Sequence, residues 1–252
     1  MQVISNQRLN KDHTLIELKS DIRLEGIVPG QFANILVDKS HNIFLRRPFS
    51  IHQVDYKCNS IVFLIKEVGD GSKCLSNSLV GETWSIILPL GKGFSIPENK
   101  SKVLLVGGGC GVAPLMLLAT NLHKAGHQIE ILLGAKSAED LVELDVYSKY
   151  GIVHTTTEDG THGTRGFVTD HPLFDKSLAS FDKIFTCGPE PMMRAVAQKA
   201  RISNIACEVS LENTMACGYG VCLCCVTDTT EGHRCVCTDG PVFDIKQLKW
   251  QN

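Results

Sequence analysis

The stretch VLLVGGGCGVAPLMLLATNLHKAG, residues 103–126, decides the fold of this chain. Its first four residues form an unbroken apolar run, which is typical of a strand buried on both faces of a parallel sheet. Glycines follow at positions 107, 108, 109 and 111, and a helical pattern then continues to Gly126. A strand, a glycine turn and a helix in this order predict the first half of a βαβ unit.

The residues downstream continue this alternation. Apolar runs at 129–135, 151–159 and 181–189 predict three more strands, and EPMMRAVAQKA at 190–200 predicts a helix. Strands that alternate with helices indicate a parallel sheet. We therefore expect an α/β nucleotide-binding domain over residues 99–207.

The residues upstream have a different pattern. Runs at 15–22, 31–37, 60–68 and 83–90 are β-branched or alternating, and Gly, Pro and Asp turns separate them. Several short strands at this spacing favour a small barrel. We expect a β-barrel domain over residues 1–98. The run at 91–102 looks like a linker, and it crosses the boundary between the barrel and the α/β domain. We expect a third, cysteine-rich lobe over residues 208–252.

Composition narrows the class of protein. The chain has 252 residues, a net charge of −2 and eleven cysteines, of which six lie between Cys217 and Cys237. The charge gives no indication of a nucleic-acid surface, and we find no membrane-spanning run or signal peptide. We therefore expect a cytoplasmic protein, in which clustered cysteines indicate metal binding better than disulfides.

The cysteine cluster has the spacing of an iron–sulfur site. Cys217, Cys222 and Cys225 follow the pattern C-x4-C-x2-C, which is the plant-type [2Fe–2S] arrangement. A structural zinc site is the alternative, although zinc cages usually pair two C-x2-C units. The spacing selects Cys225 over Cys224. The fourth ligand is Cys235 or Cys237, which would share one face of a strand, so the spacing leaves both open.

Two segments of the barrel suit a flavin. In Arg46-Arg47-Pro48-Phe49-Ser50, an arginine can bind phosphate, the ring can pack beside isoalloxazine, and the serine can reach the flavin N5 edge. The turn at 69–73 offers backbone amides and a hydroxyl to a pyrophosphate. The strand before it, with Leu64, Ile65 and Lys66, can lay its backbone along the cofactor. The alternative is a surface arginine pair and an ordinary turn.

Two further motifs suit a nicotinamide nucleotide. Glycines at the end of the first strand of the α/β domain let the backbone approach a pyrophosphate at a helix N-terminus: Gly107, Gly109 and Gly111. Cys187 and Gly188 follow another buried strand, where open α/β sheets bind their ligands. The alternatives are a tight turn and a buried cysteine. Lys136 beside Glu139 and Asp140 leaves NAD and NADP both open.

Taken together and in order, these motifs resemble the ferredoxin–NADP reductase superfamily. R-x-F-S, G-S, G-x-G-x-G-x-x-P and C-G-P-E-P-M-M cover the first two segments. The tail, with S-L-E-N-T-M-A-C-G-Y-G-V-C-L-C-C-V and C-T-D-G-P-V-F, is similar to the electron-transfer subunits of NAD-dependent, two-component dihydroorotate dehydrogenases. Phe49 departs from the superfamily's usual tyrosine, and Cys224 and Cys235 are additional thiols.

The resemblance implies cofactors and the residues that hold them. It implies FAD bound by Arg47, Pro48, Phe49, Ser50, Leu64, Ile65, Lys66, Gly71 and Ser72. It also implies NAD, and a [2Fe–2S] cluster on Cys217, Cys222, Cys225 and Cys237. Its fold is a β-barrel FAD domain and an α/β domain of the ferredoxin reductase type, with a small C-terminal cluster lobe.

The resemblance also implies a function in pyrimidine (UMP) biosynthesis. Electrons pass from the FMN-containing catalytic subunit, in a two-plus-two heterotetramer, through the cluster and FAD to NAD+. We assign no acid–base catalytic residue to this chain, because the cofactors perform the redox chemistry. The alternatives are a subunit of another NAD(P)H–ferredoxin, hydrogenase or sulfite-reducing complex, and a metal-bearing binding module with a vestigial reductase fold.

Overall fold

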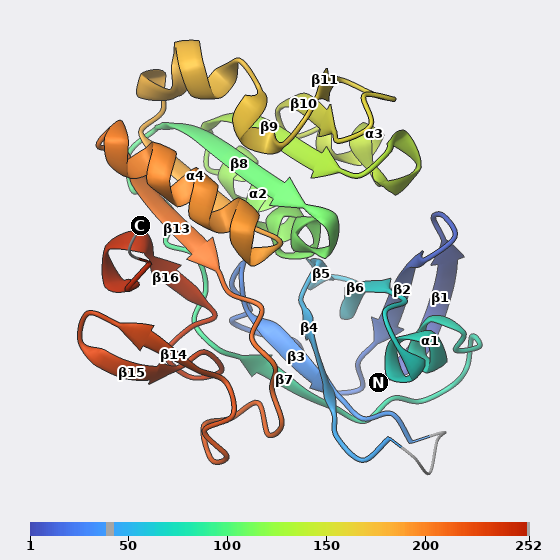
Figure 1. Cartoon of the computed structure of the whole chain (residues 1–252). Helices are drawn as coiled ribbons and strands as arrows, with labels where there is room; N and C mark the ends of the chain where they lie inside the picture. The colour runs from blue at the N-terminus through green and yellow to red at the C-terminus, as the bar shows by residue number, and fades with distance from the viewer. Residues whose placement is uncertain (39–42, 251–252) are drawn as a thin grey trace.

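The N-terminal part of the chain folds into two antiparallel sheets around one core. The computed structural model describes residues 1–38 and 43–250. The first sheet has the order β1 (Gln2–Arg8), β2 (His13–Lys19), β6 (Ser60–Lys66) and β5 (Gln53–Asp55). The second has the order β4 (Arg47–Ser50), β3 (Phe32–Ile35) and β7 (Ile86–Leu90). The short helix α1 (Asp70–Ser76) follows β6 (Figure 1).

Side-chain alternation explains why the four-stranded sheet closes over this core. In β6, Ile61, Phe63 and Ile65 are fully buried and pack with Ile16 and Leu18 of β2. Successive residues of a strand point to opposite faces, so every second residue of β6 enters the core. Leu64 lies on the other face and joins the core of the next domain.

A seven-stranded sheet forms the second part of the molecule. Its order is β11 (Thr164–Arg165), β10 (Ile152–Thr157), β9 (Gln128–Ala135), β8 (Lys102–Gly108), β12 (Lys183–Cys187), β13 (Ala206–Ser210) and β16 (Val242–Asp244). All neighbours are parallel except β13 and β16. The order reverses at β8, so the crevice for a ligand lies where β8 and β12 end.

Helices cover both faces of this sheet. Leu104 and Val106 of β8 pack in the cluster that includes α4 (Glu190–Ile202), and Val103 and Leu105 pack in the cluster with α2 (Ala113–Lys124). Figure 1 shows α4 in front of the sheet. The remaining helical segments are α3 (Leu144–Tyr147), η1 (Gly109–Val112), η2 (Ala138–Asp140), η3 (Val168–Asp170), η4 (Leu173–Ser177), η5 (Leu178–Ser180) and η6 (Ile245–Gln247).

The C-terminal lobe is joined to the sheet. Its hairpin consists of β14 (Val226–Thr229) and β15 (Gly232–Cys235), and β16 then pairs with β13 at the edge of the seven-stranded sheet. The only strand expected here was one carrying both Cys235 and Cys237; β15 ends at Cys235, so Cys237 lies beyond it, and β14 and β16 are additional strands. β13 also continues across the expected boundary at 207/208, because its last residues are paired on both sides.

The expected fold class, a β-barrel and an α/β domain with a small C-terminal lobe, is confirmed. α2 and α4 and the strands β2, β3, β6 to β10 and β12 all overlap the runs that predicted them. Within residues 1–38 and 43–250, no helix combines the length and apolar content needed to cross a bilayer.

Candidate functional site

One cavity lies where the barrel, the α/β sheet and the start of the C-terminal lobe meet. Its volume is about 400 Å³. Five parts of the chain line it: β3 and β4 of the barrel, the end of β6 with α1, η1 with the start of α2, the segment from the end of β13 onward, and Pro241 just before β16. The lining residues are Phe32, Arg47, Pro48, Phe49, Ser50, Leu64, Lys66, Val68, Gly69, Asp70, Gly71, Ser72, Cys110, Ala113, Ser210, Leu211, Glu212, Asn213, Thr214, Met215 and Pro241.

The whole R-x-F-S motif reaches this cavity. Arg47, Pro48, Phe49 and Ser50 form β4, which pairs with β3 and so lies along one wall. The neighbouring Arg46 points elsewhere, since its guanidinium donates to Ser85 O and Ser85 Oγ at 2.8 and 2.9 Å. The R-x-F-S pattern selects Arg47, and Arg47 is the arginine that lines the cavity.

The end of β6 forms a second wall. Leu64 and Lys66 line the cavity, whereas the side chain of Ile65 is fully buried in the barrel core. Ile65 can therefore offer a ligand only its backbone. A Cβ on Gly71 would lie 3.0 Å from Arg47 Nε, so the guanidinium and the α1 backbone lie close together. Lys66, Arg47 and the α1 amides, groups of the kind that bind a diphosphate, lie at this end of the cavity together with Asp70.

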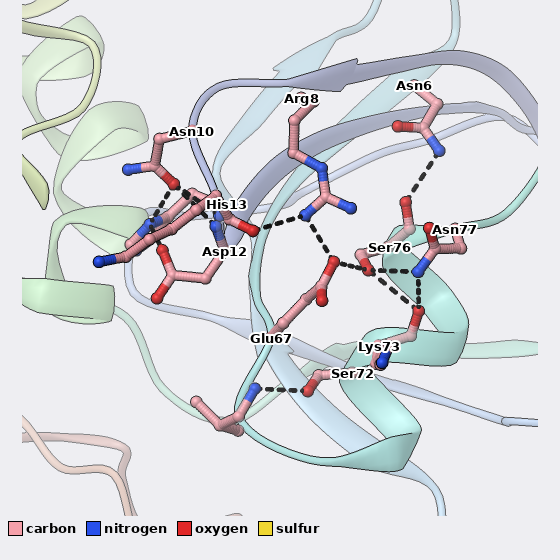
Figure 2. A network of polar contacts seen from close by, with 12 residues as sticks. Asn6, Arg8, Asn10, Asp12, His13, Glu67, Ser72, Lys73, Ser76 and Asn77 are labelled. Atoms are coloured by element: carbon pink, nitrogen blue, oxygen red, sulfur yellow. Dashed lines mark hydrogen bonds and ion pairs between the residues drawn. The ribbon is translucent and has the colours of Figure 1, made fainter. Parts of the chain in front are cut away.

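Polar contacts with β1 and with Glu67, the residue that follows β6, hold α1 in place beside the cavity. Ser76 Oγ donates to Glu67 Oε1 at 2.7 Å, and Arg8 pairs with the same carboxylate (Figure 2). Asn6 Nδ2 donates to Ser76 O at 3.0 Å. Ser72 Oγ accepts from the amides of Val68 and Gly69 at 2.9 and 3.1 Å. The Ser72 hydroxyl thus lines the cavity but is already engaged in the first turn of its own helix.

The two nicotinamide motifs lie against each other. A Cβ on Gly111 would lie 2.2 Å from the carbonyl carbon and oxygen of Cys187 and 2.3 Å from Gly188 N. Gly108 and Gly188 likewise both lie against the side chain of Met192. Only glycine at position 111 permits this approach. The sequence predicted that both motifs serve one ligand, and the fold brings them to the ends of the adjacent strands β8 and β12.

Gly107, Gly109, Gly111, Cys187 and Gly188 are not among the residues that line the cavity, although their neighbours Cys110 and Ala113 are. Cys187 is next to the cavity wall, because its thiol lies 3.8 Å from Oε1 of Glu212, which lines the cavity. Burial raises the pKa of Cys187 well above its ordinary value and also raises the pKa of Glu212.

The segment from Ser210 to Met215 forms a cavity wall that was not predicted from the sequence. This segment begins at the carboxyl end of β13, where an open α/β sheet binds its ligands. The rule that singled out Gly107 and Cys187 would therefore have found it, had β13 been predicted. The segment also leads directly to Cys217, two residues beyond Met215.

The loop from Cys217 to Cys225, here called the cysteine loop, lies beside Cys237. Backbone amides of these residues donate to the thiols of three predicted ligands, Cys217, Cys225 and Cys237. Tyr219 N and Cys222 N both donate to Cys217 Sγ at 3.5 Å, and Gly220 N donates to Cys237 Sγ at 3.1 Å. Cys237 N in turn donates to Cys225 Sγ at 3.4 Å. Hydrogen bonds of this kind tune the potential of an iron–sulfur cluster.

The two additional thiols lie differently. Cys225 and Cys237 are each 2% exposed, whereas Cys235 is half-buried like Cys217, and Cys224 is exposed like Cys222. Among the hydrogen bonds of the described residues, none reaches the thiol of Cys224 or Cys235. Cys237 N and Cys225 Sγ are in contact, which favours Cys237 as the partner of Cys225.

The thiols also differ in acidity. The Tyr219 amide lowers the pKa of the Cys217 thiol to about 6, and burial raises that of Cys237 to about 12. A coordinating metal deprotonates a thiol outright, so both can serve as thiolates. In the described part of the chain, no three His, Cys, Asp or Glu side chains converge as a single metal ion requires. A [2Fe–2S] cluster does not need three such side chains at one point, because each of its two irons binds only two protein thiolates.

The barrel holds the cysteine loop. Asn34 of β3 is buried and donates through Nδ2 to Cys217 O at 2.7 Å. Gly218 follows with φ of +81°, and a Cβ there would lie 2.6 Å from Asn34 Nδ2. A side chain at position 218 would therefore meet both backbone strain and the amide that anchors the loop.

Comparison with known proteins supports the reductase architecture. The fold is shared with a ferredoxin reductase of carbazole 1,9a-dioxygenase (TM-score 0.67, 21% identity, 81% of this chain and 64% of that one). The solved structure of an NADH-dependent reduced ferredoxin-NADP oxidoreductase is similar over 99% of this chain and 89% of its own, with a TM-score of 0.88 and 29% identity. The fold and site thus define an oxidoreductase of the ferredoxin reductase type.

Sequence comparison gives the family. The model for the oxidoreductase NAD-binding domain matches residues 105–198, and that for the iron-sulfur cluster binding domain of dihydroorotate dehydrogenase B matches residues 212–249. The dihydroorotate dehydrogenase B (NAD(+)) electron transfer subunit of Shouchella clausii is 35% identical over 98% of this chain and 96% of its own length. That of Fusobacterium nucleatum is 36% identical over 96% and 94%. The chain belongs to this family of electron transfer subunits.

Proposed function

We propose that this chain carries electrons from an FMN-containing dihydroorotate dehydrogenase subunit to NAD+, through a [2Fe–2S] cluster and FAD, in pyrimidine biosynthesis. One observation carries the proposal. The segment from Ser210 to Met215 lines the cavity beside the R-x-F-S motif and continues within two residues to Cys217. The flavin cavity and the cysteine loop are therefore neighbours along the chain as well as in space.

The flavin part of the proposal rests on the cavity. Arg47 would bind phosphate, Phe49 would pack beside the isoalloxazine, and Ser50 would face its N5 edge. Pro48, Leu64, Lys66, Gly71 and Ser72 would complete the walls, with Ile65 contributing only backbone. When bound, FAD exchanges a hydride with the nicotinamide and single electrons with the cluster.

The nicotinamide part rests on the contact between the two glycine motifs. Gly107, Gly109 and Gly111 would cradle the pyrophosphate, and Cys187 with Gly188 would lie on the nicotinamide side. We propose NAD rather than NADP, because Glu139 and Asp140 follow Lys136 directly after β9 and oppose a 2′-phosphate.

The cluster part rests on the amide contacts of the cysteine loop. Cys217, Cys222, Cys225 and Cys237 would be the ligands, with Cys224 and Cys235 left as free thiols. We propose functional units at 1–98 for FAD, 99–207 for the nicotinamide and 208–252 for the cluster.

The partner would dock on the cysteine loop. Single-electron transfer requires the cluster near the partner's flavin, and this loop exposes three apolar side chains, Tyr219, Val221 and Leu223, at 53%, 74% and 64%. Two copies of each subunit would form a heterotetramer. Free cysteines throughout the described chain suit a reducing compartment, and we propose the cytoplasm.

Metal analysis and the visible spectrum test the cofactor set. We expect bound FAD and about two irons with about two acid-labile sulfides per chain. Stoichiometric zinc in protein purified without oxygen would contradict the cluster. A colourless protein would favour a binding module that has lost its redox function.

Reconstitution with the cognate FMN subunit tests the division of labour. Alone, this chain should oxidise NADH with ferricyanide but should not oxidise dihydroorotate, because its cavity residues are committed to the flavin. The pair should catalyse NAD+-dependent dihydroorotate oxidation. Cys222→Ser should lose the cluster and this coupled activity, and retain the ferricyanide reaction.

Two results would contradict the relay. Coupled turnover in a Cys222→Ser protein shown to lack iron would exclude the cluster as an electron carrier. If the two chains fail to associate, the chain serves a different redox complex, and co-purification from the native cell would identify it.

A further inference from the structure

A buried histidine joins the barrel to the α/β domain directly behind the cavity. His52 lies two residues after Ser50, and its side chain is fully buried. Its ring Nδ1 lies 2.9 Å from the carbonyl oxygen of Ala113, and its Nε2 lies 3.0 Å from Glu143 Oε2. A carbonyl can only accept, so Nδ1 carries a proton and donates it to Ala113.

The carboxylate that meets this histidine is buried, and the short distance between Nε2 and Oε2 is an ion-pair contact without hydrogen-bond geometry. The Glu143 side chain is 5% exposed, and its backbone is left-handed, with φ of 58° and ψ of 27°. A glutamate adopts this conformation only where its surroundings demand it. Glu143 is the N-cap residue of α3, directly before the first residue of the helix.

The same short helix supplies a second contact to the start of α2. Tyr147 at the end of α3 is fully buried, and its hydroxyl donates to Val112 O at 2.6 Å. The carbonyls of Val112 and Ala113 therefore each accept one side-chain hydrogen bond, from Tyr147 and His52. Glu143 links these two side chains, because it contacts His52 and lies one turn before Tyr147.

These two carbonyls belong to the residues that follow the glycine turn. Gly111 precedes Val112 directly, and Ala113 lines the cavity. His52 itself follows the R-x-F-S motif, which lines the barrel wall of the cavity. The contact thus spans from the flavin wall to the nicotinamide turn, across 61 residues of sequence.

We propose that His52, supported by Glu143, is a positioning residue that sets the nicotinamide turn relative to the flavin wall. It touches neither proposed cofactor site directly. Its loss would let the start of α2 shift relative to β4, and the hydride would then pass less readily between nicotinamide and flavin, one of which is oxidised as the other is reduced. This inference rests on the proposed function.

Matched variants separate the two contacts of the ring. His52→Ala removes both, whereas His52→Asn keeps an amide donor near the position of Nδ1 and loses the contact with Glu143. Glu143→Gln keeps the shape of the carboxylate but not its charge. His123→Ala is the control, because His123 also contacts a carbonyl, Tyr150 O at 3.2 Å, but is exposed near the other end of α2.

Four measurements on the full chain loaded with its cofactors report the outcome. They are FAD content, the dissociation constant for NADH, the rate of flavin reduction at saturating NADH, and deuterium uptake of the peptide that covers residues 109–116. In His52→Ala we expect flavin reduction to slow by about 10- to 100-fold, the effect of misplacing reacting groups by roughly 1 Å. Deuterium uptake should rise, and NADH affinity and FAD content should change little.

Rescue distinguishes positioning from a general loss of structure. His52→Asn should recover part of the rate, because it restores the donor to Ala113 O but not the contact with Glu143, and His123→Ala should match the wild type. Combining His52→Ala with Glu143→Gln should add little to His52→Ala alone, because residues that act as one unit are not additive. If His52→Ala does not fold, Glu143→Gln must still slow flavin reduction and raise deuterium uptake.

Several results would overturn the inference. They are an unchanged rate in folded His52→Ala, a loss explained entirely by weaker NADH binding or missing FAD, and a His52→Asn protein as slow as His52→Ala. Wild-type protein that binds no flavin would instead refute the proposed function, so the two failures can be told apart.

Discussion

Substituting Gly111 with alanine tests the contact that brings the two nicotinamide motifs together. The added Cβ would lie 2.2 Å from the Cys187 carbonyl, where real Cβ atoms essentially never approach within 3.0 Å. The opposing atoms are backbone, so no side chain can rotate away. The turn and the end of β12 must therefore move apart by roughly 1 Å, a displacement that can cost on the order of 100-fold in rate.

The effect on stability can be estimated in the same way. Forcing an extra methyl into a packed site costs about 1–3 kcal/mol. For a chain of this size each kcal/mol lowers the melting temperature by about 2–4 °C. Gly111→Ala should therefore melt roughly 2–12 °C below the wild type and reduce ferricyanide with NADH far more slowly.

Gly109→Ala is the matched control in the same turn. A Cβ there meets nothing within 4 Å, but φ is +55°. This variant should lose roughly 1–2 kcal/mol through backbone strain alone, without separating the strands. The assays are calorimetry of the protein with its cofactors and steady-state NADH oxidation. A Gly111→Ala protein with the stability of the wild type, or one no worse than Gly109→Ala in both assays, would refute the reasoning.

Further substitutions test the other parts of the site. Cys237→Ser should lose the cluster absorbance and iron, and Cys235→Ser should keep both; the reverse pattern would make Cys235 the fourth ligand. Arg47→Ala should retain FAD about 10- to 150-fold less tightly, because a charge-assisted bond to phosphate contributes about 1.5–3 kcal/mol; unchanged flavin content after dialysis would remove Arg47 from the site. Burial raises the pKa of Glu212 in the folded protein above its pKa in the unfolded chain. The contribution of Glu212 to the free energy of unfolding is therefore present below the unfolded-state pKa and is lost as the pH rises through the folded-state pKa. Glu212→Gln should lack this loss, and parallel stability curves for the two proteins in denaturant titrations from pH 4 to 8 would contradict the assignment.

Sequence periodicity was sufficient for the main elements of the fold. The run at 103–106 is apolar at every position because both faces of β8 are covered, one by α2 and the other by α4. The runs that predicted β2, β3, β6 and β7 have the β-branched or alternating character of a half-buried sheet. These signals are local, and the sequence determined them without knowledge of any long-range contact.

The short elements of the C-terminal lobe could not be predicted in the same way. β13 has the sequence ACEVS, and β16 is only three residues long. Neither has a periodic pattern that decides a strand. They become strands because β12 offers a free edge to β13 and β13 then offers its own to β16.

The sequence by itself determined the chemistry of this protein, because cysteine spacing, the glycine turn and R-x-F-S each depend on residues that are neighbours along the chain. Only the tertiary structure decided which residues share a site. It showed that the Ile65 side chain lies in the barrel core, that Glu212 belongs to the cavity wall and that His52 lies against Glu143. The physical reason is that each of these outcomes depends on packing between segments remote in sequence, and no local pattern encodes which remote surfaces will meet.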